Sequence, residues 1–67
     1  MEGYLFNYSL GYKVGTQWYT WKLYENKTDV TADLKKIREQ VPSARKARLQ
    51  KRFCGLLWKT EKTYRQF

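Results

Sequence analysis

The sequence contains no histidine and a single cysteine, Cys54. One cysteine cannot form a disulfide within the chain, whereas small secreted domains usually carry an even set of cysteines. A structural zinc site usually needs four thiolate or imidazole ligands, which this composition does not supply. These absences exclude a disulfide scaffold and argue against a metal or cofactor. They predict an intracellular, cytoplasmic protein in which Cys54 is a small apolar filler of the core.

Long apolar runs are also missing. The uninterrupted apolar stretches are only a few residues long, far shorter than the ~20 residues of a transmembrane helix, so we expect no membrane span. We expect no secretory signal either, because the start, Met1-Glu2-Gly3-Tyr4, is acidic and no long apolar stretch follows it. The 6 carboxylates are scattered and have no histidine to work with, so we expect no enzyme.

What the sequence does contain is aromatic side chains and positive charge. Aromatic residues make up 18% of the 67 residues and the net charge is +8, which fits one small folded domain over 1–67 rather than a disordered basic tail. Residues 1–42 are nearly neutral, whereas 43–67 contain one acid, Glu61. This asymmetry indicates a surface for a polyanion or an acidic partner. The basic residues of the second segment are Arg45, Lys46, Arg48, Lys51, Arg52, Lys59, Lys62 and Arg65.

The first part of the chain alternates between apolar and polar side chains. This pattern predicts two strands, over about 4–14 and 17–24, and Gly15-Thr16 suits a type II′ turn between them. The predicted facing pairs are Tyr12 with Tyr19, Leu10 with Trp21, and Tyr8 with Leu23. The hairpin would therefore bury one apolar face. The outer face would carry Lys13, Lys22, Trp18 and Tyr24.

The second part of the chain has helical spacing. Val30, Leu34, Ile37 and Val41 predict a helix over about 29–41, which Thr28 or Asp29 caps and Pro42 ends. A second helix is expected over about 43–64, with an apolar stripe that includes Leu49, Phe53, Leu56, Leu57 and Tyr64. Gly55 disfavours that helix. The alternative is a third strand over about 56–64, with Leu56, Trp58 and Tyr64 facing the core.

The expected fold is therefore α+β, with an antiparallel hairpin packed on two helices. On the second helix Arg45, Arg48 and Arg52 would form one row, and guanidinium groups fit phosphates and carboxylates. We expect a nucleic-acid-binding protein, with DNA slightly favoured over RNA. Its basic helix would contact phosphates through Arg45, Lys46, Arg48, Lys51 and Arg52, extended by Lys59, Lys62 and Arg65.

Exposed aromatic side chains are the second part of this hypothesis. Trp18 and Tyr24, beside Lys13 and Lys22, could stack on bases or anchor a protein interface. The alternative is that the second helix covers this face and buries both rings, and Trp58 is expected in the core. The alternative function is a small regulator or inhibitor that binds an acidic surface of a larger protein. A homodimer is compatible with either function, because the core of so short a chain is small.

Overall fold

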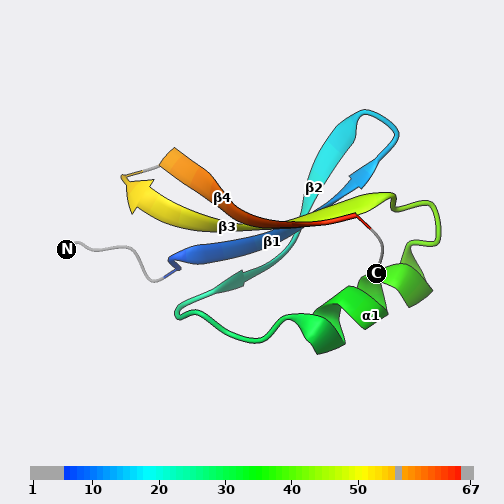
Figure 1. Ribbon diagram of the computed structural model, residues 1–67, viewed down its shortest axis with the longest axis horizontal. Coiled ribbons are helices and arrows are strands. Elements are labelled where there is room, and N and C mark those ends of the chain that lie inside the picture. The colour runs from blue at the N-terminus through cyan, green and yellow to red at the C-terminus, as the bar shows by residue number, and fades with distance from the viewer. Residues whose placement is uncertain (1–5, 56, 66–67) are drawn as a thin grey trace.

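The computed structural model describes residues 6–55 and 57–65. They form one antiparallel sheet and one helix (Figure 1), in the chain order β1 (Tyr8–Val14), β2 (Gln17–Tyr24), α1 (Thr31–Gln40), β3 (Lys46–Cys54) and β4 (Leu57–Tyr64). The strand order across the sheet is β2-β1-β3-β4. The expected hairpin on two helices is therefore wrong, because residues 46–64 form a second hairpin in place of a second helix. Residues 4–5, 56 and 66–67, which also entered the predictions, lie outside the described residues.

The turn between β1 and β2 has the predicted position. Gly15 has a φ of 62° and Thr16 does not have a positive φ, which matches a type II′ turn with glycine at its first central position. From this turn the register runs as expected through Tyr12 opposite Tyr19 and Gly11 opposite Thr20.

A β-bulge at Trp21 then shifts the register of the first hairpin. Leu10 pairs with Lys22, and Tyr8 with Tyr24, in place of the predicted Trp21 and Leu23. A bulge inserts one unpaired residue, so the side chains beyond it change faces relative to a simple alternation. Lys22 and Tyr24 consequently lie on the same side of the sheet as Leu10 and Tyr8.

The helix α1 forms where the apolar spacing predicted it. The N-cap residue is Val30, without a side-chain capping hydrogen bond, so the expected cap at Thr28 or Asp29 is not formed. Just before the helix, the Asp29 carboxylate accepts from the backbone N–H of Thr31 at 3.0 Å and from the Thr31 hydroxyl at 2.6 Å. The helix ends at Gln40, shortly before Pro42, where the chain can no longer continue in the α conformation. Among the described residues α1 is the only helix, and it is too short and too polar to cross a membrane.

Lys46–Cys54 and Leu57–Tyr64 form strands, and the first of them gives β1 a partner on its second edge. β3 pairs with β1 from Tyr8 opposite Lys51 to Lys13 opposite Lys46, which satisfies backbone groups that a helix would leave unpaired. Gly55 has a φ of 54° and lies in the turn to β4. Phe53 and Leu57, two members of the predicted helical stripe, are 62% and 57% exposed, so that stripe is not the core.

The core lies between one face of the sheet and α1. Its buried members are Leu10, Val30, Leu34, Ile37, Ala47 and Leu49. Aromatic side chains from three strands pack around them, namely Tyr8, Tyr12, Trp21, Tyr24 and Tyr64. Because α1 covers only one side, the other face of the sheet is left uncovered by the described part of the chain (Figure 1).

Candidate nucleic-acid interface

The uncovered side of the sheet, called the open face here, is defined by the strand register. Leu10, Ala47 and Leu49 point toward α1, so their neighbours in each strand point away from it. The two hairpins bend away from α1 at opposite ends of the sheet, so the open face lies between raised ends (Figure 1). The open face comprises Ser9, Gly11 and Lys13 of β1, Trp18, Thr20 and Leu23 of β2, Lys46, Arg48, Gln50 and Arg52 of β3, and Trp58, Thr60 and Thr63 of β4.

One end of the open face carries an arginine stacked on a tryptophan. The guanidinium carbon of Arg48 lies 4.1 Å from the centroid of the Trp18 ring, and Nζ of Lys13 lies 5.9 Å from it. Arg48 is on β3 and Trp18 is on β2, so the arginine side chain crosses β1 to reach the ring. Gly11 of β1 is the direct cross-strand partner of Arg48.

Lys13 and Lys46 are direct cross-strand partners at the same end. Like charges that face each other across two strands destabilise a sheet, and a bound anion would relieve this repulsion. Together with Arg48 they place three cations at this end of the open face. A second like-charge pair, Lys51 with Lys59, lies on the α1 side of the sheet.

The other end of the open face carries a second stack, which is held more firmly. The guanidinium carbon of Arg52 lies 4.5 Å from the centroid of the Trp58 ring, its cross-strand partner. Nε of Arg52 donates to the carbonyl oxygen of Phe6 at 2.9 Å, and Nη1 donates to the carbonyl oxygen of Gly55. Arg52 thus fixes Trp58 in place.

Small polar side chains lie between the two stacks. Ser9 is only 6% exposed. It pairs with Gln50 of β3, which in turn pairs with Thr60 of β4, and its partner on β2 is the apolar Leu23. Hydroxyl and amide groups can both donate and accept hydrogen bonds. The middle of the open face can therefore contact the polar edge of a ligand whose charged groups lie among Lys13, Lys46 and Arg48.

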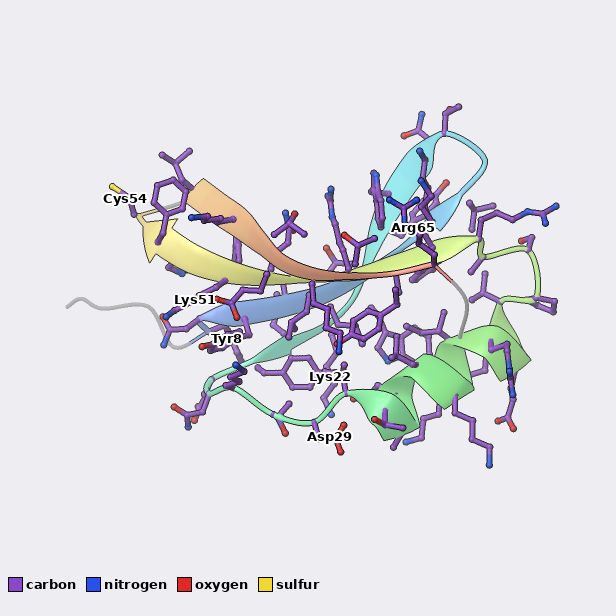
Figure 2. All side chains as sticks on the ribbon, in the orientation of Figure 1. Tyr8, Lys22, Asp29, Lys51, Cys54 and Arg65 are labelled. Carbon is purple, nitrogen blue, oxygen red and sulfur yellow. The ribbon has the colours of Figure 1, made fainter. Side chains whose placement is uncertain are left out.

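Acidic side chains are concentrated on the opposite side of the molecule. Four of the described acids lie in the loop after β2 and in α1, and Figure 2 shows Asp29 on the α1 side of the sheet. The remaining described acid, Glu61, is the bulged residue of β4. This separation leaves the open face positive. The four acids of the loop and helix are Glu25, Asp29, Asp33 and Glu39.

The predicted site residues are divided between the two sides of the sheet. The open face brings together Lys13, Trp18, Lys46, Arg48 and Arg52, and Figure 2 shows Arg65 on the same side. The predicted close row of Arg45, Arg48 and Arg52 does not form. Arg48 and Arg52 share the open face, but four residues of extended strand separate them by about 13 Å, and Arg45 lies outside β3. Arg45 precedes β3, where its backbone N–H donates to the carbonyl oxygen of Lys13. The predicted residues on the α1 side are Lys22, Tyr24, Lys51, Lys59 and Lys62.

Tyr24 is part of the core rather than an exposed stacking residue. Its hydroxyl donates to Asp33 at 2.5 Å. Burial and the neighbouring Asp33 carboxylate raise the pKa of its phenol well above the usual value. Lys22 lies beside it, with Nζ 5.6 Å from the centroid of the Tyr24 ring. The bulge at Trp21 is the reason that the predicted outer face for these two residues was wrong.

Two expectations for the second half of the chain were also wrong. Trp58, expected in the core, is half-buried on the open face, because the bulge at Glu61 separates its face from that of Tyr64. The alternative of a third strand over about 56–64 placed Trp58 and Tyr64 both toward the core. No local sequence signal marks the bulge that separates them. Cys54, expected as core filler, is exposed next to the β3–β4 turn.

No protein-family model, no curated protein and no solved structure matches this chain. The described residues contain no group of three or more His, Cys, Asp or Glu side chains that could hold a metal ion. The open face, with its two arginine–tryptophan stacks and its lysine pair, is the most distinctive concentration of polar chemistry on the described surface.

Proposed function

We propose that this protein binds nucleic acid, without catalysis, through the open face of its sheet. The observation that carries the proposal is the cluster at one end of that face, where Lys13 and Lys46 oppose each other and Arg48 lies over Trp18. These three cations would contact phosphates, with Arg65 extending the contact. The cations on the α1 side are not part of the proposed interface.

Phosphate is the ligand chemistry that suits this cluster. Neutralising phosphates releases counterions, and this supplies most of the affinity of sequence-independent binding. A merely solubilising surface mixes both signs of charge, whereas the defined open face carries cations and no acid. DNA is the first ligand to test, and an intracellular, reducing compartment is part of the proposal because the exposed Cys54 is a free thiol.

The salt dependence of binding tests the proposal. Fluorescence anisotropy with a labelled DNA oligonucleotide should give a plot of log K against log salt with a slope of about −2 to −4, as expected for three to five contacted phosphates on a single strand. A flat plot would contradict phosphate binding.

A matched pair of triple variants locates the interface. Replacing Lys13, Lys46 and Arg48 with glutamine should weaken binding by about tenfold or more at moderate salt. The control replaces Lys27, Lys35 and Lys36, exposed lysines of the loop and α1, and so makes the same change in net charge. Equal losses in the two variants would mean that net charge acts without a defined site.

A regulator or inhibitor that docks on an acidic protein surface is the second candidate. Exposed Phe53 and Leu57 at the β3–β4 turn favour it, since protein interfaces combine apolar anchors with charged rims. Replacing both with serine should leave DNA binding unchanged if nucleic acid is the ligand. A homodimer is compatible with either candidate. Sedimentation analysis of the unmodified protein and of the variant with serine at Phe53 and Leu57 would detect it.

A further inference from the structure

We infer that the open face is built for a single strand, whose bases stack at Trp18 and at Trp58. This inference rests on the proposed function and adds the class of nucleic acid and the route of the strand. Both indole rings are half-buried, so part of each remains accessible. Each also carries a guanidinium group within stacking distance, and bases stack on aromatic rings and on guanidinium planes alike.

The two stacks lie at opposite corners of the sheet. Trp18 is on β2 and Trp58 is on β4, the two outer strands, which are about 14 Å apart for a strand spacing of about 4.8 Å. Along the strands, Trp18 is level with Lys13 and Lys46, and Trp58 is level with Arg52. Lys46 and Arg52 are about 20 Å apart on β3 at about 3.3 Å per residue. The diagonal is therefore about 25 Å, which requires a ligand of several nucleotides.

A duplex cannot use both corners. Its bases are already stacked on one another, so it presents only their edges, in grooves. The major groove is about 12 Å wide and admits a helix or a two-stranded ribbon, whereas this face is four strands wide. An unpaired strand can turn its bases toward the sheet and its phosphates toward Lys13, Lys46 and Arg48.

The helix does not offer an alternative duplex-binding element. The exposed side of α1 carries Lys35, Lys36 and Arg38, but Asp33 and Glu39 belong to the same helix. Its charge is mixed, as on an ordinary solvated surface. The structure therefore favours the open face and a single strand.

The two arginines have different roles in this arrangement. Arg52 is a positioning residue, because its hydrogen bonds to Phe6 and Gly55 hold it against Trp58. Arg48 is a contact residue that reaches across β1 and can pair with a phosphate while it lies over Trp18. A base at either corner would extend a stack that already exists in the free protein, so little ordering is required.

The experiment compares three ligands of equal length with the unmodified protein. They are a thymidine 12-mer, an abasic 12-mer that keeps the phosphates and lacks the bases, and a 12-base-pair duplex. At moderate salt the thymidine 12-mer should bind at least about fivefold more tightly than the abasic strand, since each stacked base contributes that much or more. It should also bind more tightly than the duplex.

Each outcome bears on a distinct claim. If the abasic strand or the duplex binds as tightly as the thymidine strand, the stacking inference is overturned while nucleic-acid binding stands. If none of the three ligands binds, the proposed function and the inference both fail. Shortening the thymidine strand should lower the affinity sharply once it no longer spans both tryptophans.

Two further measurements identify the stacking residues. In a ¹H–¹⁵N spectrum, the indole signals of Trp18 and Trp58 should shift on addition of the thymidine 12-mer, while that of Trp21, which packs against the core, should not. Trp18→Ala and Trp58→Ala should each lose at least about fivefold in affinity for this strand, and Trp21→Phe should lose none. Unshifted signals at Trp18 and Trp58 would overturn the inference without any variant that depends on correct folding.

Discussion

The hydroxyl of Tyr24 donates a 2.5 Å hydrogen bond to Oδ2 of Asp33 and so joins the end of β2 to the first turn of α1. This bond holds the pKa of the Asp33 carboxyl below its usual value, and a hydrogen bond from Trp21 and the charges of Lys22 and Lys36 act in the same direction. The pair positions α1 over one face of the sheet. The helix therefore does not reach the open face.

The first prediction concerns acid stability. Because the pKa of Asp33 is lower in the folded than in the unfolded state, its carboxylate stabilises the fold above about pH 4. That contribution to stability is lost as the pH falls through the pKa that Asp33 has in the folded state. Tyr24→Phe should lower the free energy of unfolding at neutral pH by about 1 kcal/mol and should flatten its dependence on pH in acid. Thermal melts across the acid range measure both effects.

The same pair predicts the behaviour in alkali. The raised pKa of the Tyr24 phenol contributes stability that is complete below its ordinary value of 10.0 and is lost as the pH rises further. Tyr24→Phe should therefore lose less stability above that pH than the unmodified protein. Tyr19→Phe, which removes a phenol hydroxyl from an exposed side chain, is the control. If the free energy of unfolding depends on alkaline pH in the same way for Tyr19→Phe and Tyr24→Phe, the role of Asp33 is contradicted.

The second prediction concerns Gly11. A Cβ atom at this position would lie 2.9 Å from the carbonyl oxygen of Tyr19, too close for any side chain, so β2 would have to move. Gly11→Ala should cost about 1–3 kcal/mol, as overpacking does elsewhere. Urea denaturation gives the value, and Thr20→Ala, at its exposed cross-strand partner, should cost clearly less.

The third prediction separates Arg52 from Arg48. Arg52→Lys keeps the charge but cannot reproduce the contacts to Phe6, Gly55 and Trp58, so it should lower the free energy of unfolding by about 1–2 kcal/mol. It should also move the Trp58 indole signal. Arg48→Lys should change stability less, because its described contact is the stack on Trp18 without a hydrogen bond to the backbone. Equal stability losses would contradict the positioning role of Arg52.

The fourth prediction concerns the Lys13–Lys46 pair. If the two ammonium groups repel each other across the strands, Lys46→Gln should raise the free energy of unfolding at low salt by about 0.2–1 kcal/mol. The gain should shrink as salt screens the repulsion. Lys35→Gln on α1 should show no such gain. The stabilised Lys46→Gln variant should at the same time bind DNA more weakly, and a variant that gained stability and affinity together would contradict the proposed interface.

The fifth prediction concerns Cys54, which is exposed next to the β3–β4 turn. It should react completely with a thiol reagent in the folded protein without denaturant. The labelled protein should melt within about 2 °C of the unlabelled one, because surface changes have small effects on stability. Reaction only after unfolding would contradict the exposed position.

Parts of this fold could be predicted from local patterns, and others could not. The turn at Gly15-Thr16 and the helix with Leu34 and Ile37 follow from glycine and from apolar spacing. The bulge at Trp21 could not be read from the sequence, because simple alternation pairs Leu10 with the apolar Trp21, whereas the observed register places the charged Lys22 opposite Leu10.

The second hairpin was mispredicted for a different reason. The spacing of Leu49 and Phe53 also fits one side of a helix. The strand is favoured by pairing with the free edge of β1, which is far away in the sequence and leaves no local signal. The basic residues of the candidate interface were identified by charge, which does not depend on secondary structure. Which of them share a face depended on the strand period, so Lys51 was wrongly grouped with Arg48.

The strand order has a consequence for how the chain folds. β1 is made early in the chain but occupies the middle of the sheet, so one of its edges has no partner until Lys46–Cys54 has been synthesised. The pairing of β1 with β3 closes a long loop that contains β2 and α1, and such distant contacts slow folding. A nascent or truncated chain without β3 would expose that edge and its apolar neighbours, which favours pairing with another chain.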